Sequence, residues 1–403
     1  MKFFVNTTIL IFKRNIIGVF LFFYGINLFS QESINSNEAN ILSSAVGEFT
    51  GALNLSLPLA SVNSGKLSIP VTLTYVGDGL KPGQDCGPVG LNWVINSHFV
   101  IQRIVKDNND LGVSCSLAGY NYCPTCSDSD ISSGTFDGAR DLYNYSFGQE
   151  RGNFYINTDY TIQFLNKTDI KIEYFPCTGI TPAKFKVKLQ DGTSIFLSTN
   201  YGVNAETTFL PVICTSYDAK DTIKYEYEYS EYSTPALLRS GPTSFPTIPI
   251  STIGNFASSN ILLKKVIGYN DTLEFVINNR ADITGINGYS PAVRYNSLTY
   301  KTDSTCVKYT FDSDYFEDGT GVKTQLRLRS LKQNQCTTPY DSIPSYYFEY
   351  YGPNNTNGTQ FCPKKSTTGL DTYGYYNGIT TNSASNMIPI GIGSGQANRI
   401  ISL

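Results

Sequence analysis

The chain has 403 residues, with 30 lysines and arginines against 33 aspartates and glutamates, and a net charge of −3. That balance argues against a nucleic-acid binder, because neutralising phosphates requires a basic surface. Aromatic residues make up 13% of the chain and charged residues 16%, a composition too apolar for disorder and too rich in β-forming residues for a helical bundle.

Residues 1–30 have the pattern of a secretory signal peptide. Basic residues end at Lys13 and Arg14, and an uncharged apolar run follows from Asn15 to Phe29. This run is too short to span a bilayer comfortably, and small or polar residues follow it. We therefore expect cleavage near Ser30 or Gln31 and a secreted or cell-surface protein, with a retained membrane anchor as the alternative. No later segment has an apolar run of membrane-spanning length.

Beyond residue 31 the chain is a series of short strand-like segments. Apolar and polar residues alternate over Leu53–Leu59 and Leu67–Thr74, which predicts two half-buried strands joined by a turn over Val62–Lys66. Pro58 and Pro70 suit strand edges or ends, because proline cannot donate to a ladder. Similar runs follow at Gly152–Ile156, Tyr160–Phe164, Ile170–Tyr174, Ala183–Leu189, Thr193–Leu197, Thr222–Tyr229, Leu262–Tyr269, Thr272–Ile277, Cys306–Phe311, Gln325–Leu331 and Tyr346–Tyr351.

This pattern predicts an all-β protein of many short antiparallel strands in meanders and hairpins, forming a sandwich-like or open shell-like assembly. The stretch from Ser233 to Asn260 holds four prolines among serine, threonine and glycine, and we interpret it as a long connection. The predicted organisation is a β-rich region over 31–232, the connection over 233–260, and a second β-rich region over 261–403. The second region is either separate from the first or continuous with it.

All nine cysteines follow the expected cleavage point, so in an exported protein we expect most of them to pair and at least one to stay free or bridge to another chain. Cys115, Cys123 and Cys126 lie close together. They resemble half of a zinc site or a redox CxxC pair, but no second ligand pair follows, so we favour local disulfides. The other cysteines are Cys86, Cys177, Cys214, Cys306, Cys336 and Cys362.

Two acidic clusters are candidates for calcium binding or glycoside hydrolysis. Neither has the glycine and terminal glutamate of the twelve-residue calcium loop. We interpret them as solvated loop acids, with a weak exposed calcium site as the alternative, and single out no catalytic pair. Their members are Asp128, Asp130, Asp137 and Asp141 in one cluster, and Asp312, Asp314, Glu317 and Asp318 in the other.

His98 is the single histidine, so a multi-histidine metal centre is excluded. It lies in the strand-like run Trp93–Val100, and we interpret it as a structural residue. Two tyrosine-rich runs either stack on sugars or pack on a sheet face, and we favour packing. We expect no catalytic, cofactor-binding or metal site. The tyrosines are Tyr225, Tyr227, Tyr229 and Tyr232, then Tyr346, Tyr347, Tyr350 and Tyr351.

Several segments occur in a characteristic order, from a GxxxG stretch to a GYYNG stretch. They are Gly47–Gly51, Leu67–Tyr75, Gly79–Lys81, Val89–Trp93, Arg103 with Asp107 or Asp110, Asp141–Tyr155, Phe185–Thr193, Tyr346–Tyr351, Asp371–Gly378 and Ala397–Arg399. This order resembles the N-terminal region of bacterial secreted Rhs/YD-repeat proteins and spans nearly all of the chain after residue 31. Asn92 stands where that family usually has glycine. The chain ends where the family normally begins its YD repeats, and it lacks those repeats and any C-terminal toxin domain.

The resemblance implies a non-catalytic exported β scaffold that acts in shell formation or extracellular contact, as a stand-alone remnant or the leading piece of a split or truncated gene. An unfinished β assembly exposes an edge or an apolar face, so we expect self-association or a downstream Rhs-like chain as partner. We expect no enzyme activity, no cofactor, no nucleic acid, and no membrane contact after cleavage. The alternatives are a secreted carbohydrate-active β protein that uses two loop acids, and a surface module that binds glycans or proteins.

Overall fold

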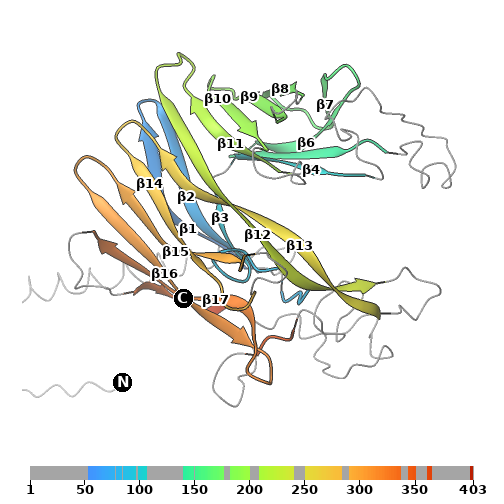
Figure 1. The fold of residues 1–403 in the computed structure, drawn as a ribbon. Helices are drawn as coiled ribbons and strands as arrows, with labels where there is room; N and C mark the ends of the chain where they lie inside the picture. Colours follow the sequence, from blue (N-terminus) through green and yellow to red (C-terminus); the bar gives the residue numbers. More distant parts are fainter. Residues whose placement is uncertain are drawn as a thin grey trace, which may run out of the picture. The chain divides into compact units, whose positions relative to one another are not determined.

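The described residues fold into antiparallel β-sheets and contain no helix, which confirms the all-β prediction (Figure 1). The chain divides into two compact units, Met1–Leu55 and Ser56–Leu403, and the described strands belong to the second except for the first two residues of the first strand, Asn54 and Leu55. Within the described ranges no helix has the length and apolarity needed to cross a membrane. The computed structural model describes residues 53–77, 79–83, 85–96, 99–106, 139–148, 150–176, 182–199, 208–239, 250–283, 290–336, 344–350, 361–364 and 400–402.

A short sheet has the strand order β1 (Asn54–Ser64), β2 (Leu67–Val76) and β3 (Trp93–Asn96). Alternate residues of β1 and β2 are buried, as the period-two pattern predicts, and the hairpin turn is tighter than expected because β1 continues to Ser64. Pro70 is tolerated in β2 because β3 pairs only with the part of β2 from Thr72 to Tyr75.

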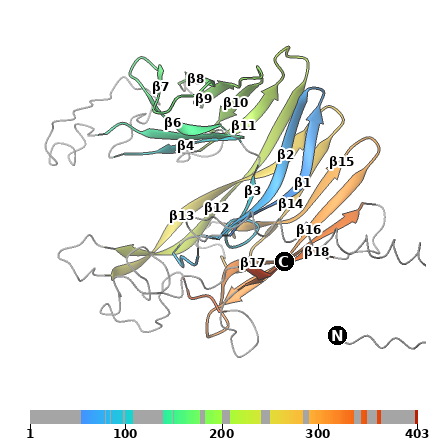
Figure 2. The same ribbon diagram turned by 180° about the vertical axis from the view of Figure 1, so that it is seen from behind.

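The second sheet has fifteen strands and includes a long meander in which chain neighbours pair from β11 to β18 (Figure 2). At β11 the sheet branches, because Thr208 and Phe209 pair with β4 while the residues from Leu210 onward pair with β10. One branch continues from β4 through β5 and β6 to β7, and the other from β10 through β9 to β8. The strands are β4 (Phe99–Ile104), β5 (Leu142–Phe147), β6 (Glu150–Ile156), β7 (Ile162–Phe164), β8 (Lys171–Phe175), β9 (Lys184–Lys188), β10 (Ser194–Ser198), β11 (Thr208–Thr215), β12 (Thr222–Arg239), β13 (Ile250–Ile267), β14 (Thr272–Asn279), β15 (Val293–Lys301), β16 (Cys306–Glu317), β17 (Lys323–Gln335) and β18 (Pro344–Tyr347). A separate pair joins β19 (Glu349–Tyr350) to β20 (Ile400–Ser402).

The expected connection over 233–260 differs from the structure. β12 extends to Arg239 and β13 begins at Ile250, and the two pair along this whole length. Pro235 is compatible with β12 because β11 pairs with β12 only from Thr222 to Lys224, so the other edge of β12 carries no described strand at Pro235. Strands from both predicted β-rich regions therefore belong to one sheet, which favours the continuous alternative.

Two groups of aromatic side chains fill the interior. One group lies on β5, β6, β9 and β11, where the ring centroids of Phe185 and Phe209 are 4.6 Å apart and those of Tyr143 and Phe154 are 5.1 Å apart. The other group surrounds Trp93, between the short sheet and the segment that includes β19. Burial of such rings is the largest apolar contribution that single residues make to a core.

Candidate functional site

Trp93, the only tryptophan, anchors the short sheet against the long one. The residue is fully buried, and its indole Nε1 donates a hydrogen bond to the Tyr350 hydroxyl at 2.9 Å. That hydroxyl in turn donates to the Leu328 carbonyl oxygen at 2.7 Å. The Trp93 ring lies 5.2 Å from the ring of Tyr75 and 4.6 Å from that of Phe348. Burial raises the pKa of Tyr350 well above its usual value, so its hydroxyl stays protonated and keeps both bonds.

The turn that leads into Trp93 requires a close backbone approach. The Leu91 amide donates to the Leu326 carbonyl oxygen at 2.9 Å. A Cβ on Gly90 would lie 3.0 Å from the Leu328 nitrogen, so this position needs glycine. Asn92 has a positive φ of 64°, a left-handed conformation that glycine adopts without strain and that asparagine tolerates better than most residues.

A second anchor is the β1–β2 turn, which contacts the turn between β11 and β12. The Lys66 amide donates to Asp221 Oδ2 at 2.9 Å, and Lys66 Nζ contacts Asp218 Oδ2 at 2.6 Å and the Tyr217 hydroxyl at 2.7 Å. The hydrogen bond between Lys66 and Asp218 raises the pKa of the lysine and lowers the pKa of the aspartate. The contact therefore keeps its charges throughout the neutral range.

The same turn also contacts the β13–β14 turn. Asp271 Oδ2 accepts hydrogen bonds from the backbone amide of Asn63 and from its side-chain Nδ2, both at 2.9 Å. The Tyr300 hydroxyl donates to the same oxygen at 2.9 Å. Burial, followed by the bond to Asp271, raises the pKa of Tyr300 to about 12. We call the three turns at residues 63–66, 217–221 and 268–271 the turn junction.

Gly268 controls how closely two of these turns approach. A Cβ at this position would lie 2.4 Å from the Asn63 carbonyl oxygen. We expect Gly268→Ala to lower the free energy of unfolding by about 1 to 3 kcal/mol, because the turns must separate to admit the methyl group. Urea denaturation followed by circular dichroism measures the change. The matched control is Gly83→Ala, since no atom lies within 4 Å of a Cβ there, and equal losses in the two variants would contradict the argument.

Asp141, interpreted from the sequence as a solvated loop acid, is instead fully buried. Its Oδ2 accepts a hydrogen bond from Arg103 Nε at 2.8 Å and also contacts Arg103 Nη2, while its Oδ1 accepts from the Lys106 amide at 2.8 Å. A buried carboxylate needs such a partner, because an unpaired charge there is strongly destabilising. The rest of its predicted cluster, Asp128, Asp130 and Asp137, lies outside the described residues.

The second acidic cluster is not in a loop over most of its length. β16 continues to Glu317, so Asp312 and Asp314 are strand residues. Asp314 lies directly opposite Arg327 of β17, and Arg327 Nε and Nη2 bind its two oxygens at 2.6 Å each. Asp312 Oδ2 accepts from the Ser330 hydroxyl at 3.2 Å. Cross-strand partners of this kind offset the low strand preference of aspartate, and sequence periodicity does not reveal them.

Asp318 closes the β16–β17 turn. Its Oδ1 accepts hydrogen bonds from the Thr320 amide at 2.8 Å and the Val322 amide at 2.9 Å, and Lys364 Nζ lies 3.1 Å from its Oδ2. Burial favours the neutral carboxyl group, but these hydrogen bonds favour the carboxylate more strongly and lower the pKa of Asp318 to about 2. The residue that resembles a calcium ligand in sequence is thus a turn acceptor.

The lowered pKa of Asp318 predicts a loss of stability in acid. The unfolded chain binds the proton near pH 4 and the folded chain only near pH 2, so the contribution is complete above pH 4 and disappears as the pH falls toward 2. We expect Asp318→Asn to cost about 2 kcal/mol at pH 7 and clearly less at pH 2.5. Unfolding measured at both pH values tests this. Asp303→Asn, in the exposed β15–β16 turn, is the control, and a penalty for Asp318→Asn that is independent of pH would refute the assignment.

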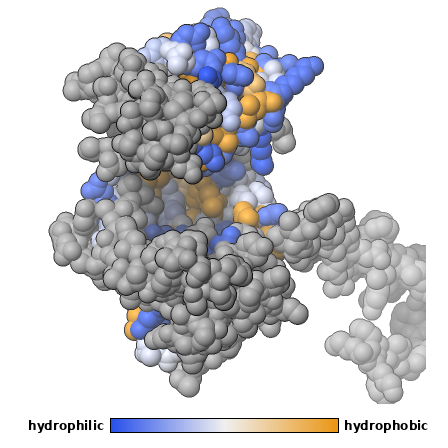
Figure 3. All heavy atoms as spheres, turned by 90° about the vertical axis from the view of Figure 1, so that its right-hand side faces the viewer, coloured by the Kyte–Doolittle hydropathy of each residue, from blue (hydrophilic) through white to orange (hydrophobic). Residues whose placement is uncertain are grey.

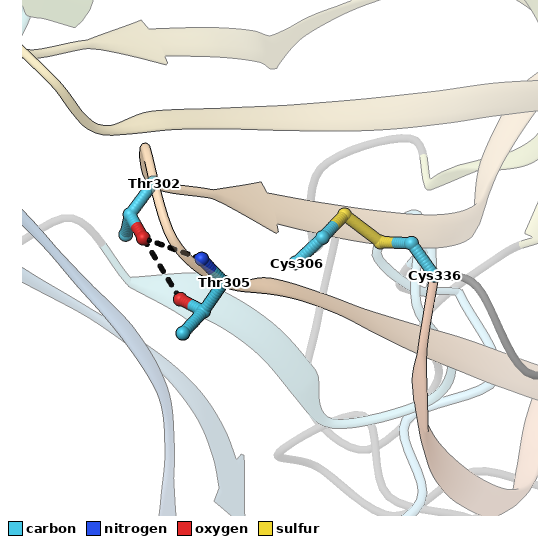
Figure 4. The surroundings of a disulfide bond; sticks show 4 residues. All are labelled: Thr302, Thr305, Cys306 and Cys336. Atoms are coloured by element: carbon cyan, nitrogen blue, oxygen red, sulfur yellow. Dashed lines mark hydrogen bonds between the residues drawn. A yellow bond between two sulfur atoms is a disulfide. The ribbon is translucent and has the colours of Figure 1, made fainter.

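The described cysteines form one disulfide and three buried thiols. Cys306 and Cys336 join the start of β16 to the residue after β17, beside a turn closed by the Thr302 and Thr305 hydroxyls (Figure 4). Cys86, Cys214 and Cys362 are free, and burial raises the pKa of Cys214 and of Cys362 to about 12. Thiols of this kind are inert at neutral pH. The expected local disulfides of Cys115, Cys123 and Cys126 lie outside the described residues, as does Cys177.

Cys86 belongs to a buried polar group that sequence reasoning missed. Arg280 Nη1 donates to the Cys86 carbonyl oxygen at 2.9 Å, and its Nη2 donates to Cys86 Sγ at 2.8 Å. Asp282 balances the charge through a bond of 2.9 Å to Arg280 Nε. The Arg-Ala-Asp sequence at 280–282 is the local signal for the ion pair. No feature of the neighbouring sequence predicts that Arg280 also binds Cys86, which is 194 residues away.

The packing predicted for the two tyrosine runs is confirmed for part of them. Tyr225, Tyr232 and Tyr350 are buried, Tyr227 and Tyr229 are half-buried, and Tyr346 and Tyr347 are exposed on β18. His98 and Tyr351 lie outside the described residues.

Comparison with known proteins gives no sequence relative: no family model and no curated protein matches the chain. Among solved structures it is similar to the crystal structure of TcdB2-TccC3, with 13% identity, a TM-score of 0.41, and coverage of 75% of this chain and 16% of that chain. It is also similar to the N-terminal domain of the effector protein SpvB from Salmonella typhimurium strain LT2, with 11% identity, a TM-score of 0.37, and coverage of 70% and 98%. Both values describe a distant likeness of fold and say nothing about activity.

The hydrogen bonds and ion pairs described above thus connect strands and sheets to one another. Within the described ranges no three histidine, cysteine, aspartate or glutamate side chains are grouped so that they could hold a metal ion. The two features with the most specific geometry are the Trp93 anchor and the turn junction. Both join the short sheet to the long one, and together they are the candidate functional site.

Proposed function

We propose that the protein is a non-catalytic exported β scaffold that takes part in cell-surface or extracellular assembly. The observation that supports this most directly is the placement of its polar groups. Asp271 and Lys66 bind directly across the two sheets, and Trp93 Nε1 does so through the Tyr350 hydroxyl, which binds the Leu328 carbonyl oxygen of β17. These contacts fix the position of one sheet against the other. Interlocked sheets of this kind make a rigid support.

The open ends of the sheets support an assembly role. The described part of the long sheet ends in β18, β7 and β8, each of which pairs along one side only, and β1 ends the short sheet. An edge strand presents unpaired amide and carbonyl groups that another strand can bind. In the face drawn in Figure 3, hydrophobic residues are exposed among hydrophilic ones. The expected partner is a second copy or a downstream chain of similar β structure.

The carboxylates favour a scaffold over the carbohydrate-active alternative. Glycoside hydrolysis needs two carboxyl groups placed across a substrate, one with a raised pKa. Asp141 is fully engaged by Arg103, and Asp314 is held at both oxygens by Arg327. The pKa of Asp318 is lowered rather than raised. None of these three acids has the environment of a proton donor.

The test is a measurement of assembly and of hydrolysis on the full chain, expressed with residues 1–30 and recovered from the culture medium or periplasm. We expect an amino terminus near Ser30 or Gln31, concentration-dependent self-association by light scattering, and no release of reducing sugar from a polysaccharide panel. A monomer at every concentration would contradict the assembly role. Hydrolysis abolished by Asp314→Asn would replace the scaffold with the enzyme alternative.

A further inference from the structure

Strand β9 presents three lysines on one face of the sheet. Phe185 and Val187 point to the buried side, and Lys184, Lys186 and Lys188 occupy the opposite side. Lysine is depleted in strands, and its usual place there is an edge, where its charge prevents aggregation. β9 is not an edge, since it pairs with β8 on one side and β10 on the other. Protection of an edge therefore does not explain these lysines.

The neighbouring strand adds positive charge at the same place. Lys171 of β8 lies directly opposite Lys188, an arrangement of like charges that destabilises a sheet. The single acid on this face of β8 and β9 is Glu173, which lies opposite Lys186 and 2.9 Å from Lys171 Nζ. The hydrogen bond from Lys171, and then the nearby charges of Lys186 and Lys188, lower the pKa of Glu173. Among the described residues of β8 and β9, this face thus has four lysines against one acid.

Two phenylalanine rings lie among these lysines. Phe175, 46% exposed, lies opposite Lys184. Phe196 of β10 lies opposite Lys186, whose Nζ is 5.5 Å from the centroid of its ring. We call this surface, made by Lys171, Phe175, Lys184, Lys186, Lys188 and Phe196, the lysine–phenylalanine face.

The spacing of the face is set by the sheet. Adjacent strands lie about 4.8 Å apart, and alternate residues on one strand are about 6.7 Å apart, so the lysines and phenylalanines are regularly spaced over the sheet face. Regular spacing of this kind fits an extended, regularly charged polymer. Its charges are complementary to carboxylates or sulfates, and flat apolar rings accept the apolar faces of sugar rings.

We propose that the lysine–phenylalanine face binds an acidic polysaccharide, with the lysines on its carboxylate or sulfate groups and the two phenylalanines beneath its sugar rings. A bilayer fits less well, because insertion requires clustered apolar side chains and Phe175 is the one strongly exposed apolar residue of the face. Nucleic acid fits less well because the whole chain carries a net charge of −3. The proposal does not depend on the proposed scaffold function, because binding of a polysaccharide at this face neither requires nor excludes catalysis elsewhere in the chain.

The experiment measures binding of the full exported chain to polygalacturonate and to dextran sulfate, with neutral dextran as the uncharged control. We expect binding to at least one acidic polymer that weakens as salt is raised. The variant Lys184→Gln/Lys186→Gln/Lys188→Gln should bind about tenfold more weakly, since it removes three charge contacts at the surface of the sheet. It should still fold, because it also removes the repulsion between Lys171 and Lys188, and a thermal melt confirms this.

The matched control is Lys301→Gln/Lys308→Gln/Lys323→Gln, which removes three exposed lysines from β15, β16 and β17 and should leave binding unchanged. Phe175→Ser should weaken polysaccharide binding without changing its salt dependence. Absence of binding to both acidic polymers, or equal losses in the two triple variants, would overturn the proposal. Tighter binding to phosphatidylserine vesicles or to double-stranded DNA than to either polysaccharide would overturn it as well.

Discussion

Replacement of Trp93 by alanine is expected to remove about 3 to 5 kcal/mol of unfolding free energy. The side chain is fully buried against Tyr75 and Phe348, and its loss leaves a large cavity between the sheets. It also removes the indole donor to the Tyr350 hydroxyl. Because Trp93 is the single tryptophan, unfolding of the variant must be followed by far-UV circular dichroism in urea rather than by fluorescence.

Trp93→Phe separates the contribution of packing to stability from that of the hydrogen bond. It keeps an aromatic ring in the cluster and loses the Nε1 donor, so we expect a smaller loss, of about 1 to 2 kcal/mol. Val94→Ala is a control on the same strand, because the Val94 side chain is 52% exposed, and it should change stability little. A loss for Trp93→Ala no larger than that of Val94→Ala would show that Trp93 does not anchor the sheets.

Replacement of Arg103 by alanine should lower the free energy of unfolding about as much as Trp93→Ala does. Arg103→Ala takes the guanidinium charge away from the buried Asp141 carboxylate while the Lys106 amide bond remains, which is expected to cost about 3 to 5 kcal/mol. The measurement is again urea unfolding at neutral pH. The double variant Arg103→Met/Asp141→Leu should be more stable than Arg103→Ala, since it removes the buried carboxylate together with the guanidinium.

The control for Arg103→Ala is an exposed ion pair on the same long sheet. Arg329 lies 3.4 Å from Asp314, with most of its side chain in solvent, so Arg329→Ala should cost less than about 0.5 kcal/mol. If Arg103→Ala and Arg329→Ala had equal effects, burial would not be the source of the Arg103 contribution. If the double variant were the least stable, the pair itself would be net stabilising.

The assembly role and the lysine–phenylalanine face would use different groups of the molecule. The edges β18, β7 and β8 offer backbone groups to another strand, whereas the face on β8, β9 and β10 offers side chains. A scaffold that binds an acidic polysaccharide through this face keeps the edges β18 and β7 available for a partner. Measuring self-association with and without polygalacturonate would show whether the two kinds of contact are compatible.

The resemblance to Rhs/YD-repeat proteins rests on local motifs, and the structure gives physical reasons for some of them. Gly90 is required by its approach to Leu328, and Trp93 by the cluster it fills. The departure at Asn92 is a residue that still adopts the positive φ of the turn.

The sequence by itself determined the class of fold and the positions of many strands, because burial on one face of a strand produces a period of two that is local in the chain. The β1–β2 hairpin and β9 follow this rule. The long connection predicted over 233–260 was wrong where β12 and β13 pair, because prolines among serine, threonine and glycine do not exclude a ribbon whose outer edges carry no described strand. Only the tertiary structure decided which polar side chains are partners. Arg103 meets Asp141 across 38 residues and Trp93 meets Tyr350 across 257. Such contacts depend on strand register and on how one sheet packs on another, and neither leaves a periodic signal in the sequence.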